Sequence, residues 1–125
     1  MGVDIEQIRP IDMEIANRFF TQEEREVLFH LPGNDQLSFF YELWTLKESF
    51  VKAIGQGLSC PLDSFGFDMR NYPHTITLLD IKGRDKMEWH FKKYFLNKDY
   101  CVAICANFRY VPDNARVLNR DLFLL

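Results

Sequence analysis

The sequence lacks several features that mark whole classes of protein. It has no surplus of positive charge: 15 Lys and Arg stand against 18 Asp and Glu over 125 residues, a formal net charge of −3. Proteins that bind nucleic acid through its phosphates need such a surplus, so that class is excluded. No apolar run approaches the roughly 18 to 20 residues of a membrane span, and the first residues lack the basic and apolar regions of a secretory signal. We therefore expect a soluble, cytoplasmic protein without a membrane partner.

Cysteine is scarce and follows no ligand pattern. Cys60, Cys101 and Cys105 form an odd set without C-x-x-C spacing, which argues against a disulfide framework and a zinc site and fits a reducing cytosol. Cys101 and Cys105 lie four apart on a predicted strand, and we expect both to be small core residues. The sequence also lacks a P-loop, a dinucleotide-binding fingerprint and a nucleophile elbow.

Aromatic residues, in contrast, are abundant. They make up 15% of the chain and include twelve phenylalanines, while hydrophobic residues reach 47% and charged residues 26%. This is ordinary globular composition, and the length predicts that residues 1–125 form a single domain. Twelve phenylalanines are more than one small core usually uses. We therefore expect part of the surface to contact another polypeptide.

The first part of the chain predicts a strand and two short helices. Apolar and acidic side chains alternate over residues 2–8, which is typical of a strand. Asp12 is placed to cap a short helix that runs to residue 20. Thr21 and Glu24 have the spacing of a capping box, which predicts a second helix to about residue 30.

A long helix and a series of strands follow. From Asp35, another possible N-cap, apolar residues recur at helical spacing without Pro or Gly until Gly55, which predicts the longest helix. Beyond it, four segments are predicted as strands joined by short turns in an antiparallel meander: 64–70, 75–81, 87–95 and 100–106. The expected fold class is α+β, with one strand, then helices, then a small antiparallel sheet.

Two carboxylates lie on one face of the first predicted strand. Asp4 and Glu6 are two residues apart, so their side chains leave the same face about 7 Å apart at the backbone. Like charges near a core resist desolvation unless a cation or basic groups neutralise them. A solvated face of an edge strand is the simpler explanation, and taken alone the pair favours it.

The long helix adds a third carboxylate and a lysine. Glu48 follows Trp44 by one turn and so rises from an aromatic, largely core-facing stripe, whereas Lys47 is expected to face solvent. Lys52 lies one turn after Glu48, and an ordinary i,i+4 ion pair would account for both. Alternatively, Glu48 and the two strand carboxylates bind Mg²⁺ while Lys52 binds a phosphate oxygen. That alternative predicts metal-dependent phosphoryl-type transfer and requires that the strand and the helix meet.

Two motifs carry a resemblance to a known family. G-V-D-I-E at 2–6 and W-T-L-K-E-S-F-V-K-A-I-G at 44–55 resemble the G-[IV]-D-[IV]-E and W-x-x-K-E-[AS]-x-x-K-x-x-G motifs of 4′-phosphopantetheinyl transferases. The resemblance is to the Sfp type, which activates nonribosomal peptide and polyketide synthetases. It continues through R-F-F at 18–20, G-L-S at 57–59, P-L-D-S-F at 61–65 and the segment 101–106, and so covers nearly the whole chain.

The resemblance implies a fold, an activity and a set of site residues. The family transfers the phosphopantetheine arm of coenzyme A to a serine of an acyl or peptidyl carrier protein, and so acts as a holo-carrier-protein synthase. By this resemblance Asp4, Glu6 and Glu48 would hold Mg²⁺ against the coenzyme A pyrophosphate. Lys52 would neutralise or protonate the phosphate, and Glu48 would draw the proton from the attacking serine, either directly or through a metal-bound water.

The resemblance also implies a surface for the carrier protein, but the chain differs from Sfp-type enzymes in length. Segment 55–65 would face the carrier protein, with apolar contacts from Leu58 and Leu62. Sfp-type enzymes are two similar α+β halves packed as a pseudodimer, and this chain corresponds to the C-terminal half. The sequence contains neither the Ser-His motif of the other half nor the Thr-His motif of the short, holo-acyl-carrier-protein-synthase type. We therefore predict a homo-oligomer, most simply a dimer, or a missing N-terminal half.

Three functions compete at this point. The first is phosphopantetheinyl transfer by a catalytic half that needs a second half or self-association. The second is a non-catalytic module of the same family that dimerises and binds a carrier protein, although such a module would not need the three carboxylates. The third is an unrelated Mg²⁺-dependent phosphohydrolase, which the carboxylates alone would favour.

Overall fold

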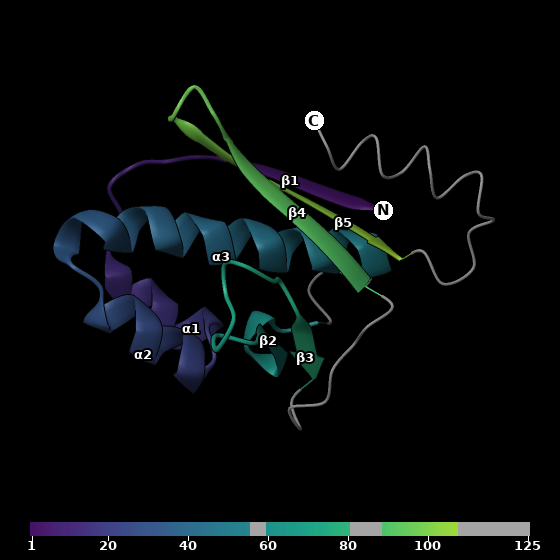
Figure 1. Ribbon diagram of the computed structural model, residues 1–125, viewed down its shortest axis with the longest axis horizontal. Coiled ribbons are helices and arrows are strands. Elements are labelled where there is room, and N and C mark those ends of the chain that lie inside the picture. The colour runs from purple at the N-terminus through teal and green to yellow at the C-terminus, as the bar shows by residue number, and fades with distance from the viewer. Residues whose placement is uncertain (56–59, 81–88, 108–125) are drawn as a thin grey trace.

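The computed structural model describes residues 1–55, 60–80 and 89–107, and its elements form two small sheets beside one long helix (Figure 1). None of the helices in these ranges is long and apolar enough to cross a membrane. The α+β class is confirmed. In chain order the elements are β1 (Gly2–Gln7), the 3₁₀ helix η1 (Met13–Ile15), α1 (Ala16–Phe19), α2 (Gln22–His30), α3 (Gly33–Ile54), the 3₁₀ helix η3 (Leu62–Ser64), β2 (Phe65–Phe67), β3 (Leu78–Asp80), β4 (Trp89–Leu96) and β5 (Tyr100–Asn107).

The short helices begin where the capping signals predict. An Asp12 carboxylate oxygen accepts a 3.0 Å hydrogen bond from the backbone N–H of Glu14 at the start of η1. Thr21 and Glu24 make both bonds of a capping box at the start of α2. Each bond satisfies a backbone donor that the first turn of a helix leaves free.

The long helix differs from the prediction at its start. It begins at Gly33, directly after Pro32, and Asp35 lies within its first turn instead of capping it. An acidic side chain there still favours the helix, because the N-terminal end carries partial positive charge. The end is as predicted, since Gly55 adopts the left-handed conformation with φ of 71°, which glycine accepts without strain.

The strands form two sheets instead of the single predicted meander. β1 pairs with β5, and β5 with β4, all antiparallel, whereas β2 and β3 pair only with each other. The predicted strand 64–70 ends early because the chain turns at Asp68, whose carboxylate accepts a 3.0 Å hydrogen bond from the backbone N–H of Arg70. The segment that follows forms turns until β3, so the predicted strand 75–81 also shortens.

The first strand lies directly against α3 (Figure 1). A Cβ atom at Gly2 would stand 1.9 Å from the backbone oxygen of Ser49 and 2.6 Å from the backbone nitrogen of Ala53. Only a residue without a side chain permits this approach. The strand and the helix therefore meet, which the sequence left open, and the next residues of the same strand face, Asp4 and Glu6, are carried toward α3.

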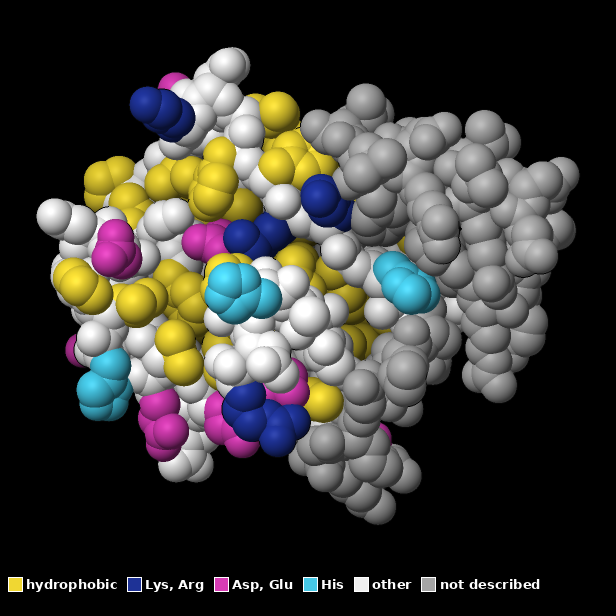
Figure 2. All heavy atoms as spheres, in the orientation of Figure 1, with side chains coloured by type: hydrophobic (Ala, Val, Ile, Leu, Met, Phe, Trp, Pro, Cys, Tyr) yellow, Lys and Arg dark blue, Asp and Glu magenta, His cyan; other side chains and the backbone are white. Residues whose placement is uncertain are grey.

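The core fills both sides of α3 and includes the two predicted core cysteines. Cys101 and Cys105 are fully buried on β5, where burial raises the pKa of each thiol and keeps both protonated. On the face shown in Figure 2, apolar side chains lie between small separate groups of acidic and basic ones. Three aromatic or aliphatic side chains near the β4–β5 turn are exposed: Phe95, Leu96 and Tyr100.

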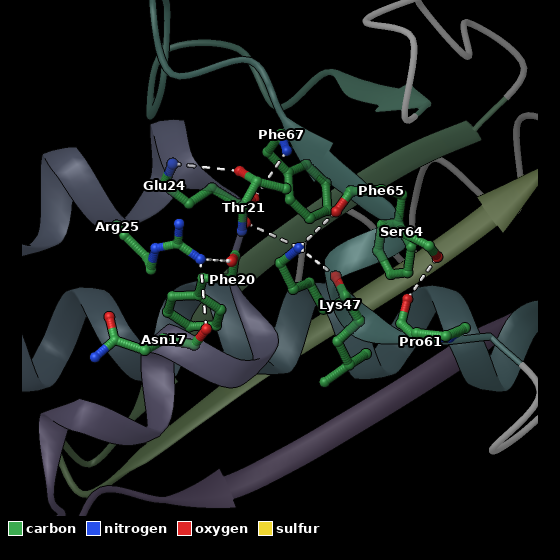
Figure 3. A network of polar contacts seen from close by, with 11 residues as sticks. Asn17, Phe20, Thr21, Glu24, Arg25, Lys47, Pro61, Ser64, Phe65 and Phe67 are labelled. Carbon is green, nitrogen blue, oxygen red and sulfur yellow. Dashed lines mark hydrogen bonds and ion pairs between the residues drawn. The ribbon is translucent and has the colours of Figure 1, made fainter.

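The prediction that Lys47 faces solvent is wrong, because its side chain is completely buried. Its ammonium group lies 2.9 Å from Glu24 of α2, which is equally buried, and donates 2.7 Å hydrogen bonds to the carbonyls of Leu62 and Phe65. All three ammonium protons thus have acceptors. The second Glu24 oxygen accepts from the backbone N–H of Phe67 at 2.9 Å. Figure 3 shows this network joining α2, α3 and β2.

We expect Lys47→Met or Glu24→Gln to lower the free energy of unfolding by about 3–5 kcal/mol, because either change strands a buried charge or buried polar group. The double variant Glu24→Gln/Lys47→Met should lose less than the sum of the two single losses, since it strands no charge. Urea denaturation measures all three. The control Lys92→Met replaces an exposed lysine on β4; a similar loss there, or strictly additive losses, would contradict the prediction.

Candidate active site at the junction of β1 and α3

The acidic face of β1 turns inward, toward α3. Asp4 is 5% exposed, whereas its apolar neighbours Val3 and Ile5 are 43% and 54% exposed. The explanation of Asp4 and Glu6 as a solvated edge-strand face is therefore wrong. The apolar residues of the strand lie on the outer face instead, and the close approach at Gly2 brings the carboxylates to the helix.

Lys52 binds Asp4, not Glu48 as an ordinary i,i+4 pair would require. Its ammonium nitrogen lies 2.7 Å from one oxygen of Asp4, and about half of the lysine side chain remains exposed, 52%. The hydrogen bond to Asp4 raises the pKa of Lys52, so the lysine stays charged. The other Asp4 oxygen is buried and has no hydrogen-bond partner. A buried carboxylate oxygen without a partner is costly and marks a place for a further cation or donor.

Glu48 completes the acidic group from the helix side. It is half-buried on α3, one turn before Lys52. Burial and the nearby charges of Asp4 and Glu6 raise the pKa of Glu48, against the opposing influence of Lys52. The structure thus brings all three predicted carboxylates into electrostatic contact, together with the predicted lysine.

Glu6 is held by a residue that the sequence placed only in an apolar stripe. The indole Nε1–H of Trp44 donates a 3.0 Å hydrogen bond to one oxygen of Glu6. The indole ring packs edge-on against Phe19, with centroids 5.4 Å apart, and stacks on Phe40 at 5.9 Å. Because Trp44 lies one turn before Glu48, helical spacing could have marked it as a neighbour of the site.

A pocket of about 780 Å³ opens beside these residues. Glu48 and Lys52 line it together with Leu62, which is 8% exposed and belongs mostly to the core. Leu58, the other predicted carrier-protein contact, lies outside the described residues. Arg18, which the sequence analysis gave only as part of the family-like segment 18–20 and not as a site residue, also lines the pocket and is its second basic side chain. The remaining lining residues are Phe19, Trp44, Val51, Gly55, Cys60, Pro61 and Asp63.

The donor set fits a small hard cation, although no site is preformed. Over residues 1–55, 60–80 and 89–107, no three His, Cys, Asp or Glu side chains already converge as metal ligands. Instead, Lys52 and Trp44 each hold one oxygen of a strand carboxylate. A bound cation would give the unpaired oxygen of Asp4 a partner. It would also reduce the repulsion between Glu48 and the two strand carboxylates. Carboxylate oxygens are the ligands that Mg²⁺ prefers.

We expect Glu48→Gln to stabilise the chain at pH 7, by less than about 1 kcal/mol, because the half-exposed site is screened by solvent. Above its raised pKa, ionised Glu48 is disfavoured in the folded state by burial and by Asp4 and Glu6. As the pH falls through that pKa the carboxyl becomes protonated, so the advantage of the variant should disappear.

Urea denaturation of both proteins from pH 7 down to about pH 4 measures this difference. The control Glu14→Gln changes an exposed carboxylate of η1 and should leave stability nearly unchanged at each pH. A Glu48→Gln variant that is less stable than the unsubstituted chain at pH 7 would show that the like charges are not in contact.

The chain is similar in sequence to known proteins over nearly its whole length. The chain is 35% identical over 125 residues to 4′-phosphopantetheinyl transferase Sfp of Bacillus subtilis (strain 168), a match that covers 99% of this chain and 54% of that protein. It is 46% identical over 125 residues to 4′-phosphopantetheinyl transferase psf-1 of Bacillus pumilus, covering 99% and 52%. The chain therefore spans about half the length of these relatives.

A solved structure shares the fold. A holo-(acyl-carrier-protein) synthase from Bacillus anthracis, determined in complex with CoA (3′,5′-ADP), matches with a TM-score of 0.59 and 22% identity over 82% of this chain and 89% of the other. Residues 1–105 match the sequence model of the 4′-phosphopantetheinyl transferase superfamily. With the identity to the two Bacillus relatives, this match shows that the chain belongs to the 4′-phosphopantetheinyl transferase superfamily.

Proposed function

We propose that this chain carries the catalytic residues for Mg²⁺-dependent transfer of 4′-phosphopantetheine from coenzyme A to a serine of an acyl or peptidyl carrier protein. The observation that carries the proposal is the convergence of Asp4, Glu6, Glu48 and Lys52 where β1 meets α3, beside a pocket. The names of the relatives and the coenzyme A complex of the Bacillus anthracis synthase support the substrate and the reaction. A cytoplasmic location remains a prediction.

The reaction exchanges a phosphoanhydride linkage of coenzyme A for a phosphate ester linkage to serine. The serine oxygen forms a bond to the phosphorus that carries the pantetheine arm, and the bond from that phosphorus to the bridging pyrophosphate oxygen breaks. Adenosine 3′,5′-bisphosphate leaves with the bridging oxygen. The serine proton goes to Glu48, which lines the pocket and whose pKa is raised by burial and by the nearby charges of Asp4 and Glu6. A raised pKa makes a carboxylate a stronger base.

Asp4, Glu6 and Glu48 would hold the Mg²⁺ ion, which when bound neutralises charge on the pyrophosphate. Lys52 would supply a second positive charge. In the free chain its ammonium group is bound to Asp4 at 2.7 Å, but half of its side chain is exposed beside the pocket. It can therefore leave Asp4 for a phosphate oxygen, where it would steady the leaving group as negative charge develops.

The carrier protein would approach through the segment after α3. The pocket joins Glu48 to residues 60–63 of that segment, so a serine delivered there would lie near the proposed base. Leu58 and Leu62 remain the predicted apolar contacts. Because Leu62 is largely buried, we expect it to shape the pocket wall while exposed neighbours make most of the contact.

The outer face of the three-stranded sheet is proposed to bind a second copy of this chain or the other half of a longer enzyme. Val3 and Ile5 are exposed on it and lie opposite Ile104 and Val102 in the antiparallel register, although these two residues of β5 are themselves buried. Residues paired in this way share one face. An apolar strip on an edge strand is typical of an interface.

The function is tested by mass spectrometry of an apo carrier protein incubated with this chain, coenzyme A and Mg²⁺. We expect phosphopantetheine to be added to the carrier serine, and expect Glu48→Gln and Lys52→Met to reduce the rate by about 100-fold or more, since each removes charge stabilisation in the transition state. Lys98→Met, in the exposed turn between β4 and β5, is the matched lysine control and should keep full activity. No transfer by the folded chain, either alone or with an N-terminal half supplied in trans, would contradict the proposal.

We expect the chain to sediment as a dimer in analytical ultracentrifugation, and the double variant Val3→Lys/Ile5→Lys to sediment as a monomer because it places charge in the proposed interface. The control Phe29→Lys alters a similarly exposed apolar residue on α2 and should leave the dimer intact. If the unsubstituted chain sediments as a monomer, the proposed dimer is contradicted, and a separate N-terminal half is left as the proposed partner of this face.

A further inference from the structure

A hydrogen bond between Trp44 and Glu6 links the aromatic stripe of α3 to the acidic face of β1. The Trp44 Nε1–H donates to one oxygen of Glu6 at 3.0 Å, and the bond spans 38 positions of the sequence from α3 to β1. An indole nitrogen is a donor only, so it can neither bind a cation nor take a proton in the reaction. Its effect on the site must pass through Glu6.

We propose that Trp44 is a positioning residue that fixes the Glu6 carboxylate for the divalent cation, an inference that rests on the proposed metal-dependent transfer. By holding one oxygen of Glu6, the indole leaves the other free for the metal and limits rotation of the carboxylate. Partners of this kind, one step removed from the metal, orient ligands and typically change metal affinity by roughly 10- to 100-fold when removed.

The indole is itself held rigidly enough for this role. Phe19 packs edge-on against it at 85° and Phe40 stacks on it at 15°. Phe40 is almost completely buried, so one face of the ring rests on the core. A donor fixed by packing loses little conformational entropy when it orients its partner.

Trp44 and Lys52 thus play different parts toward the two strand carboxylates. Lys52 is a cation, and it must leave Asp4 when a metal ion takes the same oxygen or when a phosphate attracts it. Trp44 carries no charge and holds Glu6 through an oxygen that the metal does not need. We therefore assign Trp44 a contact that persists on binding, and Lys52 one that is exchanged.

The test compares Trp44→Phe with the unsubstituted chain. Phenylalanine keeps an aromatic ring between Phe19 and Phe40 and removes the N–H donor. Isothermal titration of coenzyme A at a series of Mg²⁺ concentrations should show that half-maximal binding needs at least about 10-fold more Mg²⁺ in the variant. Coenzyme A affinity at saturating Mg²⁺ should be nearly unchanged. The other tryptophan supplies the control, since Trp89 packs on Phe50 away from the site and Trp89→Phe should not alter the Mg²⁺ requirement.

A second measurement does not depend on any ligand. In the proton–nitrogen NMR spectrum of the free chain, Glu6→Gln should move the Trp44 indole resonance and leave that of Trp89 in place. Mg²⁺ dependence of Trp44→Phe within twofold of the unsubstituted chain, or an indole resonance that ignores Glu6→Gln, would overturn the inference. If the unsubstituted chain shows no Mg²⁺-dependent binding of coenzyme A, either alone or with an N-terminal half supplied in trans, the proposed function itself fails and the role of Trp44 with it. Binding by the unsubstituted chain separates the two cases.

Discussion

The buried ion pair between Lys47 and Glu24 fixes the rotation of α3, and the arrangement of the site follows from that rotation. Lys47 directs its three protons to Glu24, Leu62 and Phe65, so this side of the helix must face α2 and β2 (Figure 3). Successive helix residues are about 100° apart around the axis. Glu48, the next residue, is therefore turned away from that buried contact and toward β1.

Among the described residues, three ion pairs join α3 to different neighbours, and they differ in how far their side chains are exposed to solvent. Lys47 binds Glu24 with no exposure on either side. Glu42 binds Lys93 of β4 at 2.7 Å and also accepts a hydrogen bond from Tyr72. Lys52 binds Asp4, but half of its side chain is exposed. Only this last pair can exchange partners without opening the core, as a phosphate-binding lysine must.

Carboxylates gather at the junction of β1 and α3, where burial and mutual repulsion make their negative charge unfavourable for folding. Asp4 is buried with one oxygen unpartnered, and Glu48 is held near both strand carboxylates. Such an arrangement costs stability and is typical of a functional site. The same alternation of β1 that turns the carboxylates inward turns Val3 and Ile5 outward, so the inner site and the proposed interface are two faces of one strand.

The sequence alone predicted the features that depend on the spacing of neighbouring residues. The capping box of Thr21 and Glu24, the left-handed end of α3 at Gly55 and the α+β class needed only neighbouring residues, and all are confirmed. The motifs around Asp4 and Glu48 also identified the family, because their spacing is read directly from the chain. Local spacing did not predict the long-range pairing: β5 pairs with β1 from the start of the chain as well as with β4, while β2 and β3 pair only with each other.

Tertiary structure decided which side chains are buried and what each one binds. Helical spacing predicted that Lys47 faces solvent and offered a Lys52–Glu48 ion pair as one of two alternatives. In the structure Lys47 is enclosed with Glu24, and Lys52 pairs with Asp4 of β1. The sequence placed Trp44 only in an apolar stripe, whereas the structure shows that its indole nitrogen donates a hydrogen bond to Glu6. These outcomes depend on contacts between segments distant in sequence, which local patterns do not encode.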